Sequence, residues 1–345
     1  MNQTIPSRPP TPAVLDLLER HFAPQSLERI LTRGGRAVPR TLWERSLAAP
    51  LRDFLSRPGK EIRARLVETG YELAGGRRSV PPALAAMVEL LHAGSLIVDD
   101  IQDGSAERRG RPTLHRRHGV PVALTAGNYL YFWPLLLVQE VALTDEAKLD
   151  IHRRVAETLV RCHHGQALDV AVRVTDLPRA DVPAVVDAAA RLKTGSLTAL
   201  CLWLGGRAAE AAPPSLDALD KFGEEFGACL QMLDDLGGLL SARRRDKGHE
   251  DLLCARLTWP WAWLAGHVPA ARYERLRQRA REVARGAAEV EGLAADLRAA
   301  VGRASAAPVR RRLRKAMDAL RHQRGPSPAL AALEREAERL EAMYA

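Results

Sequence analysis

The sequence predicts an all-α protein, folded as a single-domain helical bundle. Apolar residues recur at three- and four-residue spacing in one segment after another, which is the period of a helix that buries one face. Strict alternation of apolar and polar residues, the pattern of a half-buried strand, is almost absent. Hydrophobic residues make up 46% of the 345 residues and aromatic residues only 5%, and the many Ala, Leu and Arg residues favour packed helices over sheets.

Proline and glycine pairs mark where the predicted helices begin and end. The clearest are Pro58-Gly59, Gly75-Gly76, Pro81-Pro82, Pro213-Pro214 and Gly325-Pro326. In order along the chain, the spacing between breaks predicts helices near residues 12–33, 41–54, 60–74, 82–103, 120–139, 145–172, 181–205, 215–241, 252–264, 269–302, 308–323 and 328–343.

The proline-rich start of the chain is expected to be separate from the bundle. Residues 1–12 contain four prolines and are predicted to form a flexible arm. No linker rich in Gly, Ser or Pro divides the remainder, so residues 13–345 are expected to form one helical domain with short connections.

Charge and cysteine content narrow the class of protein. The formal net charge is +9, but the basic residues are spread along the chain without an RNA- or DNA-binding signature, so we expect no nucleic-acid partner. The four cysteines lie far apart, as expected for reduced thiols. We find no apolar run long enough to span a bilayer and no signal-peptide pattern in Met1–Pro12, and therefore expect a cytoplasmic protein without an integral membrane segment.

The first acidic cluster ends an apolar predicted helix. Asp99 and Asp103 are four residues apart and share one helical face, with Asp100 beside them and Gly104 as a C-cap. Three carboxylates at the negative end of a helix dipole repel one another unless a cation neutralises them. Mg²⁺ suits this arrangement, because it takes few protein carboxylates and keeps positions for phosphate oxygens.

A second apolar helix ends in the same way. Asp234 and Asp235 are followed by glycines, and Gln231 lies three residues earlier on the same face as Asp234. One acidic helix end is usually a solvated terminus, but two are harder to dismiss. If they face each other across a central cavity, that cavity would hold a diphosphate through several Mg²⁺ ions.

Basic residues accompany the first cluster. Arg108 and Arg109 follow it and are suited to grip phosphate oxygens in a bidentate way. Lys60 and Arg63 stand three apart at a predicted helix N-terminus, which is a site for anions. His92 lies two turns before Asp99; such a histidine is usually a core residue, but the neighbouring cations raise a functional role to an equal alternative.

These motifs, in this order, resemble the trans-isoprenyl diphosphate synthases, or polyprenyl synthetases. The resemblance runs from about Lys60 to Pro260 and is closest to geranylgeranyl diphosphate synthases. It rests on Gly59-Lys60-x-x-Arg63, Asp99-Asp100-x-x-Asp103, Arg108-Arg109-Gly110-x-Pro112-Thr113, Gly165-Gln166-x-x-Asp169, Lys193-Thr194-Gly195, Gln231-x-x-Asp234-Asp235 and Leu257-Thr258-x-Pro260. The resemblance implies the all-helical isoprenoid synthase fold, with two aspartate-rich helix ends facing a central cavity.

The resemblance also implies a role for each motif residue. It implies Mg²⁺, three ions per active site, on Asp99, Asp103 and Asp234, supported by Asp100 and Asp235. Isopentenyl diphosphate would be held by Lys60, Arg63, His92 and Arg109. The allylic diphosphate would be held by Arg108, Lys193 and Lys247, and the Thr194 carbonyl and Gln231 amide oxygen would stabilise the allylic cation. A homodimer is the family expectation.

Two departures from the family pattern lie on the second motif. Gly238 replaces its third aspartate. The lysine that usually follows this motif aligns with Asp246, with Lys247 next to it and Arg243, Arg244 and Arg245 before it as substitutes.

The implied activity is condensation of isopentenyl diphosphate with an allylic diphosphate, head to tail and in trans. Gly94 and Ser95, one turn before the aspartates, are small, so we expect a product of C20 or longer, shortened by Gly94→Phe. Alternatives are an ionisation-type terpene cyclase, suggested by the weakened second motif, and a non-catalytic partner subunit. An RNA- or membrane-surface-binding helical protein, suggested by the charge alone, ranks last.

Overall fold

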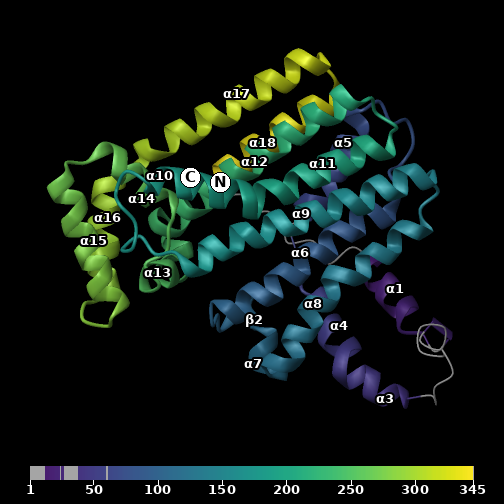
Figure 1. Cartoon of the computed structure of the whole chain (residues 1–345), viewed down its shortest axis with the longest axis horizontal. Coiled ribbons are helices and arrows are strands. Elements are labelled where there is room, and N and C mark those ends of the chain that lie inside the picture. The colour runs from purple at the N-terminus through teal and green to yellow at the C-terminus, as the bar shows by residue number, and fades with distance from the viewer. Residues whose placement is uncertain (1–11, 24, 27–37, 60, 345) are drawn as a thin grey trace. The chain divides into compact units, whose positions relative to one another are not determined.

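The computed structural model describes residues 12–23, 25–26, 38–59 and 61–344, and in this part the protein is almost entirely helical (Figure 1). The α-helices are α1 (Pro12–His21), α3 (Arg40–Trp43), α4 (Ala49–Leu55), α5 (Ile62–Leu73), α6 (Pro82–Gln102), α7 (Leu114–His118), α8 (Val120–Leu137), α9 (Asp145–Ala171), α10 (Val182–Ala190), α11 (Ser196–Ala208), α12 (Pro213–Leu240), α13 (Arg245–Leu253), α14 (Trp259–His267), α15 (Ala270–Ala284), α16 (Val290–Val301), α17 (Ala306–Arg324) and α18 (Pro328–Tyr344). The predicted all-α fold class is confirmed.

Shorter elements connect these helices. Two π-helical turns, η1 (Glu44–Ala48) and η3 (Arg191–Gly195), lie within longer helical runs. The 3₁₀ turns are η2 (Val138–Glu140), η4 (Ala242–Arg244) and η5 (Arg303–Ser305). Strands β1 (Glu107–Arg108) and β2 (Arg111–Pro112) form an antiparallel hairpin, which the sequence did not predict.

The chain forms two compact units. Unit 1 comprises Met1–Glu68 and Arg78–His152, and unit 2 comprises Thr69–Arg77 and Arg153–Ala345. Each contains an apolar cluster of its own. The single domain over residues 13–345 stays a prediction, and most of the predicted flexible arm, residues 1–11, lies outside the described residues.

In unit 1, α6 packs closely against α8. A Cβ atom added at Gly94 would lie 2.8 Å from the carbonyl oxygen of Gly127 and 2.9 Å from the Cβ of Leu130. Only glycine therefore lets the two helices approach this closely. The contact fixes α6, the helix that ends in the first acidic cluster.

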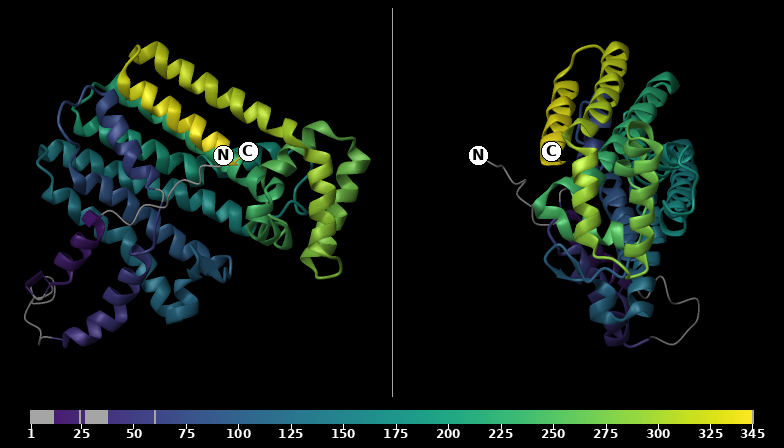
Figure 2. Two further views of the ribbon diagram at one scale, coloured as in Figure 1. Left: turned by 180° about the vertical axis from the view of Figure 1, so that it is seen from behind. Right: turned by 90° about the vertical axis from the view of Figure 1, so that its left-hand side faces the viewer.

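In unit 2, α12 is the central helix. It contacts α11, α13, α14, α17 and α18, and the last two are the neighbouring yellow helices in Figure 2. The apolar cluster beside it contains the fully buried Trp261 and Tyr273, whose rings meet edge to face. The second acidic cluster lies on this helix.

A closed ring of four charged side chains joins elements of unit 2. Asp187 of α10 accepts from Arg191 at 2.8 Å and from Arg312 at 2.5 Å. Glu225 of α12 accepts from the same two arginines, from Arg312 at 2.5 Å. Burial alone would raise the pKa of both carboxyl groups, but the two guanidinium groups lower it below its usual range. The ring ties α17 to α10, α12 and the turn η3.

Two predicted helices, 252–264 and 269–302, are each broken in two. The gap between α13 and α14 contains Ala255 at a φ of +49°, and the gap between α15 and α16 contains Gly286 at +71°. Both positions have left-handed backbone that ends a helix. The helix predicted over residues 12–33 is interrupted after His21, where α1 ends and a turn follows, and residues 27–33 lie outside the described residues.

One described helix, Val120–Glu140, has the length and apolar composition to cross a membrane, so our expectation of no such run is wrong by that measure. A single helix of this kind is weak evidence for a span, because buried helices share the composition. Its apolar residues divide between two faces. One face enters the core of unit 1, and the other carries the exposed side chains Val120, Leu124, Phe132 and Leu136.

Candidate functional site

The acidic end of α6 is built by a glycine-capped helix terminus. Gly104 has a φ of +64° and donates its N–H to Ile101, while Ser105 donates to the carbonyl of Asp100 at 3.0 Å. This pair of bonds is the Schellman motif, so the predicted C-cap is confirmed. Asp99 and Asp103 lie half-buried in the last turn, one above the other.

Asp100 is turned inward to the neighbouring hairpin. Its side chain is 1% exposed, and its Oδ1 accepts from Arg108 Nε at 2.8 Å and Nη2 at 2.5 Å. Burial raises the pKa of Asp100 above its usual range despite this arginine, and Asp99 and Asp103 raise it further. Asp100 therefore orients Arg108; its support of a metal site stays a prediction.

A tight turn presents the two arginines. Arg109 and Gly110 have φ values of +57° and +74°, as in a type I′ turn between β1 and β2. The left-handed conformation is strained for arginine, and such strain is often found at functional sites. The turn sends Arg108 towards Asp100 and leaves Arg109 at a neighbouring pocket.

Arg57 anchors this hairpin from α4's end and was missed by the sequence analysis. It is 1% exposed and donates to the carbonyl oxygens of Arg108 at 3.3 Å and Pro112 at 2.9 Å, and also to Asp53. No sequence motif marks it, because its partners on the hairpin are more than fifty residues away. A fully buried arginine bound to two strands is a structural support for the site.

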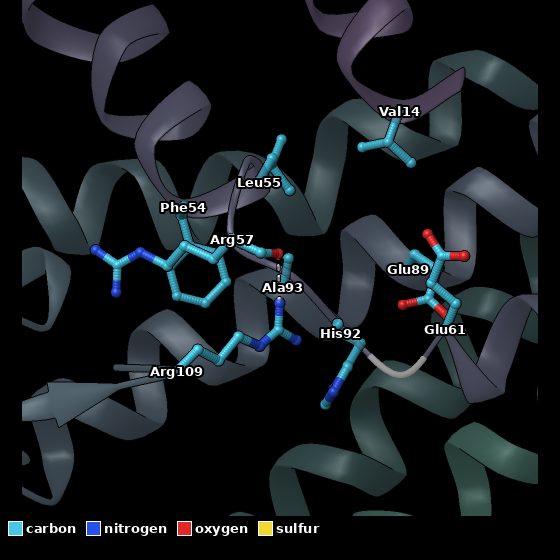
Figure 3. Close-up of a pocket in the computed structure, with 10 residues that line it drawn as sticks. Val14, Phe54, Leu55, Arg57, Glu61, Glu89, His92, Ala93 and Arg109 are labelled. Carbon is cyan, nitrogen blue, oxygen red and sulfur yellow. Dashed lines mark hydrogen bonds between the residues drawn. The ribbon is translucent and has the colours of Figure 1, made fainter. Parts of the chain in front are cut away.

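A pocket of about 450 Å³, including its open mouth, lies in unit 1 beside the hairpin (Figure 3). It is lined by Val14, Phe54, Leu55, Arg57, Gly59, Glu61, Glu89, His92, Ala93 and Arg109. Arg109 reaches it from the hairpin and donates to the carbonyl of Arg57 at 3.2 Å. Two of the predicted isopentenyl diphosphate residues, His92 and Arg109, thus share one pocket.

Burial and neighbouring positive charges determine the protonation state of His92. Burial, followed by the charges of Arg63, Arg109 and Arg108, holds the pKa of His92 well below its usual range. The imidazole is therefore neutral near pH 7 and has one N–H to donate. Arg63 lies in the first turn of α5 as predicted, whereas Lys60 lies outside the described residues.

Glu89 is a second residue that the sequence analysis missed. Its Oε1 accepts the backbone N–H of Ala64 at 3.0 Å and so caps the first turn of α5, next to Arg63. Burial lowers the pKa of Arg109, and Glu89 partly restores it. Glu89 therefore links the N-terminal turn of α5 to Arg109 in the pocket.

Gly94 and Ser95, the predicted chain-length residues, differ in their surroundings. Gly94 lies against α8, so a phenylalanine there would push the helices apart rather than simply shorten a cavity. The expectation for Gly94→Phe is corrected accordingly. Ser95 is half-buried and donates to the carbonyl of His92 at 2.8 Å, so it lies on the same face of α6 as His92 and Asp99.

In unit 2, the π-helical turn η3 carries Lys193 and Thr194. Its contact with α9 requires glycine, because a Cβ atom at Gly165 would lie 2.4 Å from the backbone nitrogen of Lys193. Lys193 Nζ lies 2.5 Å from Asp169 Oδ2, so two motifs predicted separately meet here.

Thr194 and Gln231 form a short hydrogen-bonded chain. The Thr194 hydroxyl donates to Gln231 Oε1 at 2.7 Å, and Gln231 Nε2 donates to Asp235 Oδ1 at 2.9 Å. The carbonyl oxygen of Thr194 accepts from the Thr198 hydroxyl at 3.0 Å. Each of the two oxygens expected to face an allylic cation thus accepts one hydrogen bond within the protein and keeps a second lone pair. Their role towards the cation stays a prediction.

The two aspartates of α12 have different environments. Asp234 contacts Arg244 at 2.5 Å and also Lys247, whereas Asp235 accepts from the backbone N–H of Trp259 at 2.9 Å. Burial raises the pKa of Asp235 to about 7. The α12 helix continues to Leu240, so the two aspartates lie inside it rather than at its end as predicted. Asp235 connects α12 to the start of α14, while Asp234 contacts the basic segment that follows α12.

The aspartate clusters of α6 and α12 differ in how well they could bind a divalent cation. In the described part of the chain, Asp100 Oδ2 is buried without a hydrogen-bond partner, and Asp99 and Asp103 stand beside it. This set of oxygens at a helix C-terminus fits Mg²⁺. Asp234 fits less well, since both its oxygens contact cations of the chain. No group of three or more potential ligands is already assembled among the described residues.

Solved structures define the class of this fold. The chain superposes on a polyprenyl synthetase from Streptomyces coelicolor with a TM-score of 0.69 and 25% identity, covering 96% of this chain and 98% of that one. A geranylgeranyl pyrophosphate synthase from Corynebacterium glutamicum, in complex with isoprenyl diphosphate and magnesium, gives a TM-score of 0.72 at 23% identity, covering 95% and 97%. The fold is that of the isoprenyl diphosphate synthases.

The sequence places the chain within that class. The polyprenyl synthetase family model matches residues 44–296, and the chain belongs to this family. A geranylgeranyl diphosphate synthase of Mycobacterium tuberculosis is 36% identical over 186 residues, which cover 52% of this chain and 51% of that protein. The chain thus covers about half the length of this curated relative. The resemblance inferred from the motifs is confirmed.

Proposed function

We propose that the protein is a prenyltransferase that joins isopentenyl diphosphate to an allylic diphosphate, head to tail and in trans. The observation that carries the proposal is the pocket of unit 1, where Arg109 and the neutral His92 lie together in a member of the polyprenyl synthetase family. A cyclase without isopentenyl diphosphate would have no use for this basic pocket. The pocket would take the diphosphate of isopentenyl diphosphate, with Arg63 and Lys60 as further contacts.

The end of α6 would hold the allylic diphosphate. Asp99 and Asp103 would bind Mg²⁺, which supplies positive charge to stabilise the departing diphosphate. Asp100 holds Arg108 in a fixed orientation by two hydrogen bonds, and the remaining N–H groups of Arg108 would bind phosphate oxygens. Magnesium is also present in the complex of the Corynebacterium relative. The family pattern implies three ions per site.

Unit 2 carries the second acidic cluster and two further basic residues of the motifs. We propose that Asp234 is a ligand of Mg²⁺ and that Lys193 and Lys247 bind a diphosphate. Asp169 holds the ammonium of Lys193, and the Thr194–Gln231–Asp235 chain fixes the turn beside it. The departing diphosphate would accept the proton lost after condensation, so the reaction needs no protein base.

Product length and assembly are further parts of the proposal. Ser95, on the face of α6 that bears Asp99, is small enough for a chain of C20 or longer. The Mycobacterium relative is named as a synthase of geranylgeranyl diphosphate, a C20 compound. The exposed apolar row on α8 suits a homodimer. We also propose a cytoplasmic location, because the four cysteines lie far apart in the sequence, as expected for reduced thiols.

A product assay tests this function. The purified protein is incubated with Mg²⁺, labelled isopentenyl diphosphate and dimethylallyl, geranyl or farnesyl diphosphate in turn, and products are separated by chain length. We expect a prenyl diphosphate of C20 or longer. Asp99→Asn should lower the rate at least about a hundredfold, since it removes a ligand of the cation that stabilises the leaving group. Asp318→Asn, an exposed change on α17, serves as the control.

The alternatives predict other outcomes in the same assay. Release of a hydrocarbon from geranylgeranyl diphosphate alone would identify a cyclase. No turnover of any primer by the folded protein, together with activity on addition of a second synthase, would identify a partner subunit. Either result would contradict the proposed prenyltransferase.

A further inference from the structure

Arg109 contributes an unbalanced positive charge to the pocket of unit 1. Among the residues that the structure describes, no carboxylate forms an ion pair with its guanidinium group. Burial lowers the pKa of Arg109, Glu89 offsets part of this effect, and three neighbouring arginines lower the pKa further. Because an arginine stays protonated at pH 7 even when it is buried, the positive charge remains in the pocket.

Three uncharged groups of one short segment hold the Arg109 side chain instead. Arg109 Nη1 donates to the carbonyl oxygen of Arg57 at 3.2 Å, the contact drawn as a dashed line in Figure 3. Arg109 Cζ lies 6.0 Å from the centroid of the Phe54 ring, which is within the range of a cation–π contact. A Cβ atom added at Gly59 would lie 3.3 Å from Nη1, 3.4 Å from Nη2 and 3.5 Å from Cζ, so the planar group lies face-on against this glycine.

The segment that supplies these groups is itself fixed. Phe54 is buried in the apolar cluster of unit 1, and Arg57 Cζ lies 5.5 Å from the centroid of the same ring. Asp53 accepts from Arg57 at 3.2 Å and from Arg117 of α7 at 2.6 Å. The charge of Arg57 is therefore balanced by a carboxylate, whereas that of Arg109 is not.

We infer that Phe54, the carbonyl group of Arg57 and Gly59 form an uncharged cradle that positions Arg109 for the diphosphate of isopentenyl diphosphate. The inference rests on the proposed function and names three positioning residues of its isopentenyl diphosphate site. A carboxylate could orient the guanidinium group equally well, but it would compete with the diphosphate for the same positive charge. A ring, a carbonyl oxygen and a glycine orient Arg109 without neutralising it, and they leave most of its N–H groups for phosphate oxygens.

Calorimetric titration of the full-length protein with isopentenyl diphosphate in EDTA tests the cradle. Phe54→Leu keeps an apolar side chain but removes the ring, and should raise the Kd about fivefold. Phe54→Tyr keeps the ring and should bind as the wild-type protein does. In an Arg109→Gln background, Phe54→Leu should change the Kd by less than about twofold, because the residue through which it acts is gone. A purely structural role of Phe54 would weaken binding equally in both backgrounds.

Gly59→Ala gives a second test that leaves the apolar core intact. The added Cβ atom would press on the guanidinium group, which can move aside, so we expect an unchanged free energy of unfolding and a Kd raised by about threefold, since a small displacement weakens an oriented charged hydrogen bond. Unchanged binding by folded Gly59→Ala would contradict the cradle even if Phe54→Leu failed to fold.

Phe22→Leu is the matched control, since Phe22 is a second buried phenylalanine of the same apolar cluster. We expect it to lower the free energy of unfolding in urea without changing the Kd. Equal weakening by Phe22→Leu, an unchanged Kd for folded Phe54→Leu, or no binding by the wild-type protein would each overturn the cradle. The two proposals fail separately. Weaker binding by Phe54→Leu without any prenyl product from the wild-type protein would contradict the function alone, whereas product formation with an unchanged Kd would contradict the cradle alone.

Discussion

At the scale of single residues, the site depends on side chains that hold other side chains. Glu89 caps α5 beside Arg63, and Arg57 binds both strands of the hairpin that presents Arg108 and Arg109. Neither touches a phosphate in the proposed scheme. Each acts through the position or charge of a basic neighbour.

Two substitutions of Glu89 separate its role as a helix cap from the effect of its negative charge on Arg109. Glu89→Gln keeps an oxygen that accepts the Ala64 N–H but removes the negative charge next to Arg109. We expect an unchanged free energy of unfolding and a few-fold tighter binding of pyrophosphate, since the pocket becomes more positive. Glu89→Leu removes the cap as well and should cost about 1 kcal/mol of stability. Urea unfolding and calorimetry measure both, and equal stability of the two variants would contradict the capping role.

Asp235 should make stability depend on pH in metal-free buffer. Its pKa is about 7, because burial outweighs the hydrogen bonds from Trp259 and Gln231. The folded state therefore binds this proton more tightly than the unfolded chain, so the stabilisation is complete below pH 4 and is lost as pH rises through 7. Asp251, with a pKa of about 6, acts in the same direction.

Asp235→Asn should flatten this dependence between pH 5 and 8. The difference is at most about 1.4 kcal/mol per pH unit, and solvent screening reduces it. Urea melts at several pH values measure it, with the exposed Asp246→Asn as control. Identical slopes for wild type and Asp235→Asn would rule out the raised pKa.

The residues that the sequence predicted are those with short-range spacing. Asp99 and Asp103, or Gln231 and Asp234, can be placed on one face by counting along a helix. Arg57 and Glu89 could not be found in that way, since their partners are remote in sequence or belong to another helix. The contact between Thr194 and Gln231 was missed because the two residues are remote in sequence. Each was expected to face the ligand instead.

At the scale of elements, irregular turns position the predicted site residues. The type I′ turn at Arg109-Gly110 and the π-helical turn η3 each carry predicted site residues. The apolar period predicted α6, α9 and α12 to within about two residues at each end. It could not reveal η3, because a five-residue π turn barely disturbs the helical period, nor a hairpin with strands of two residues.

The crossing of α12 and α13 leaves no room for a side chain, because two glycines meet there. Gly248→Ala would bring a Cβ atom within 2.1 Å of the Gly238 carbonyl oxygen, so α13 must shift. We expect a loss of about 2 kcal/mol in the free energy of unfolding and weaker pyrophosphate binding, because Lys247 moves with α13. Gly266→Ala, where a Cβ atom meets open space, is the control. Unchanged stability of Gly248→Ala would show that the helices are further apart than described.

At the scale of the whole molecule, the proposed homodimer would form through the exposed row on α8. Val120, Leu124, Phe132 and Leu136 are spaced at multiples of four residues, and Phe132 is 69% exposed. Side chains at this spacing form one ridge, which suits packing against another helix. The sequence showed that α8 is apolar but not which of its residues face outward, since that depends on the contact with α6.

Charges on this ridge should separate the copies. We expect the wild-type protein to be a dimer by light scattering, and the double change Phe132→Glu and Leu136→Lys to give a folded monomer, because burying these charges is costly. Leu253→Glu, at an exposed apolar residue on α13, is the control. A monomeric wild type, or a variant that stays dimeric, would contradict the proposed interface.

The charged ring closed by Arg312 has a consequence for any attempt to trim the protein. The family match stops at residue 296, yet Arg312 on α17 is one of two guanidinium groups that balance Asp187 and Glu225. A chain cut at that boundary would leave two acids competing for Arg191 alone, on the turn that carries Lys193 and Thr194. The segment that matches the family model is therefore shorter than the segment that holds the turn η3 in place.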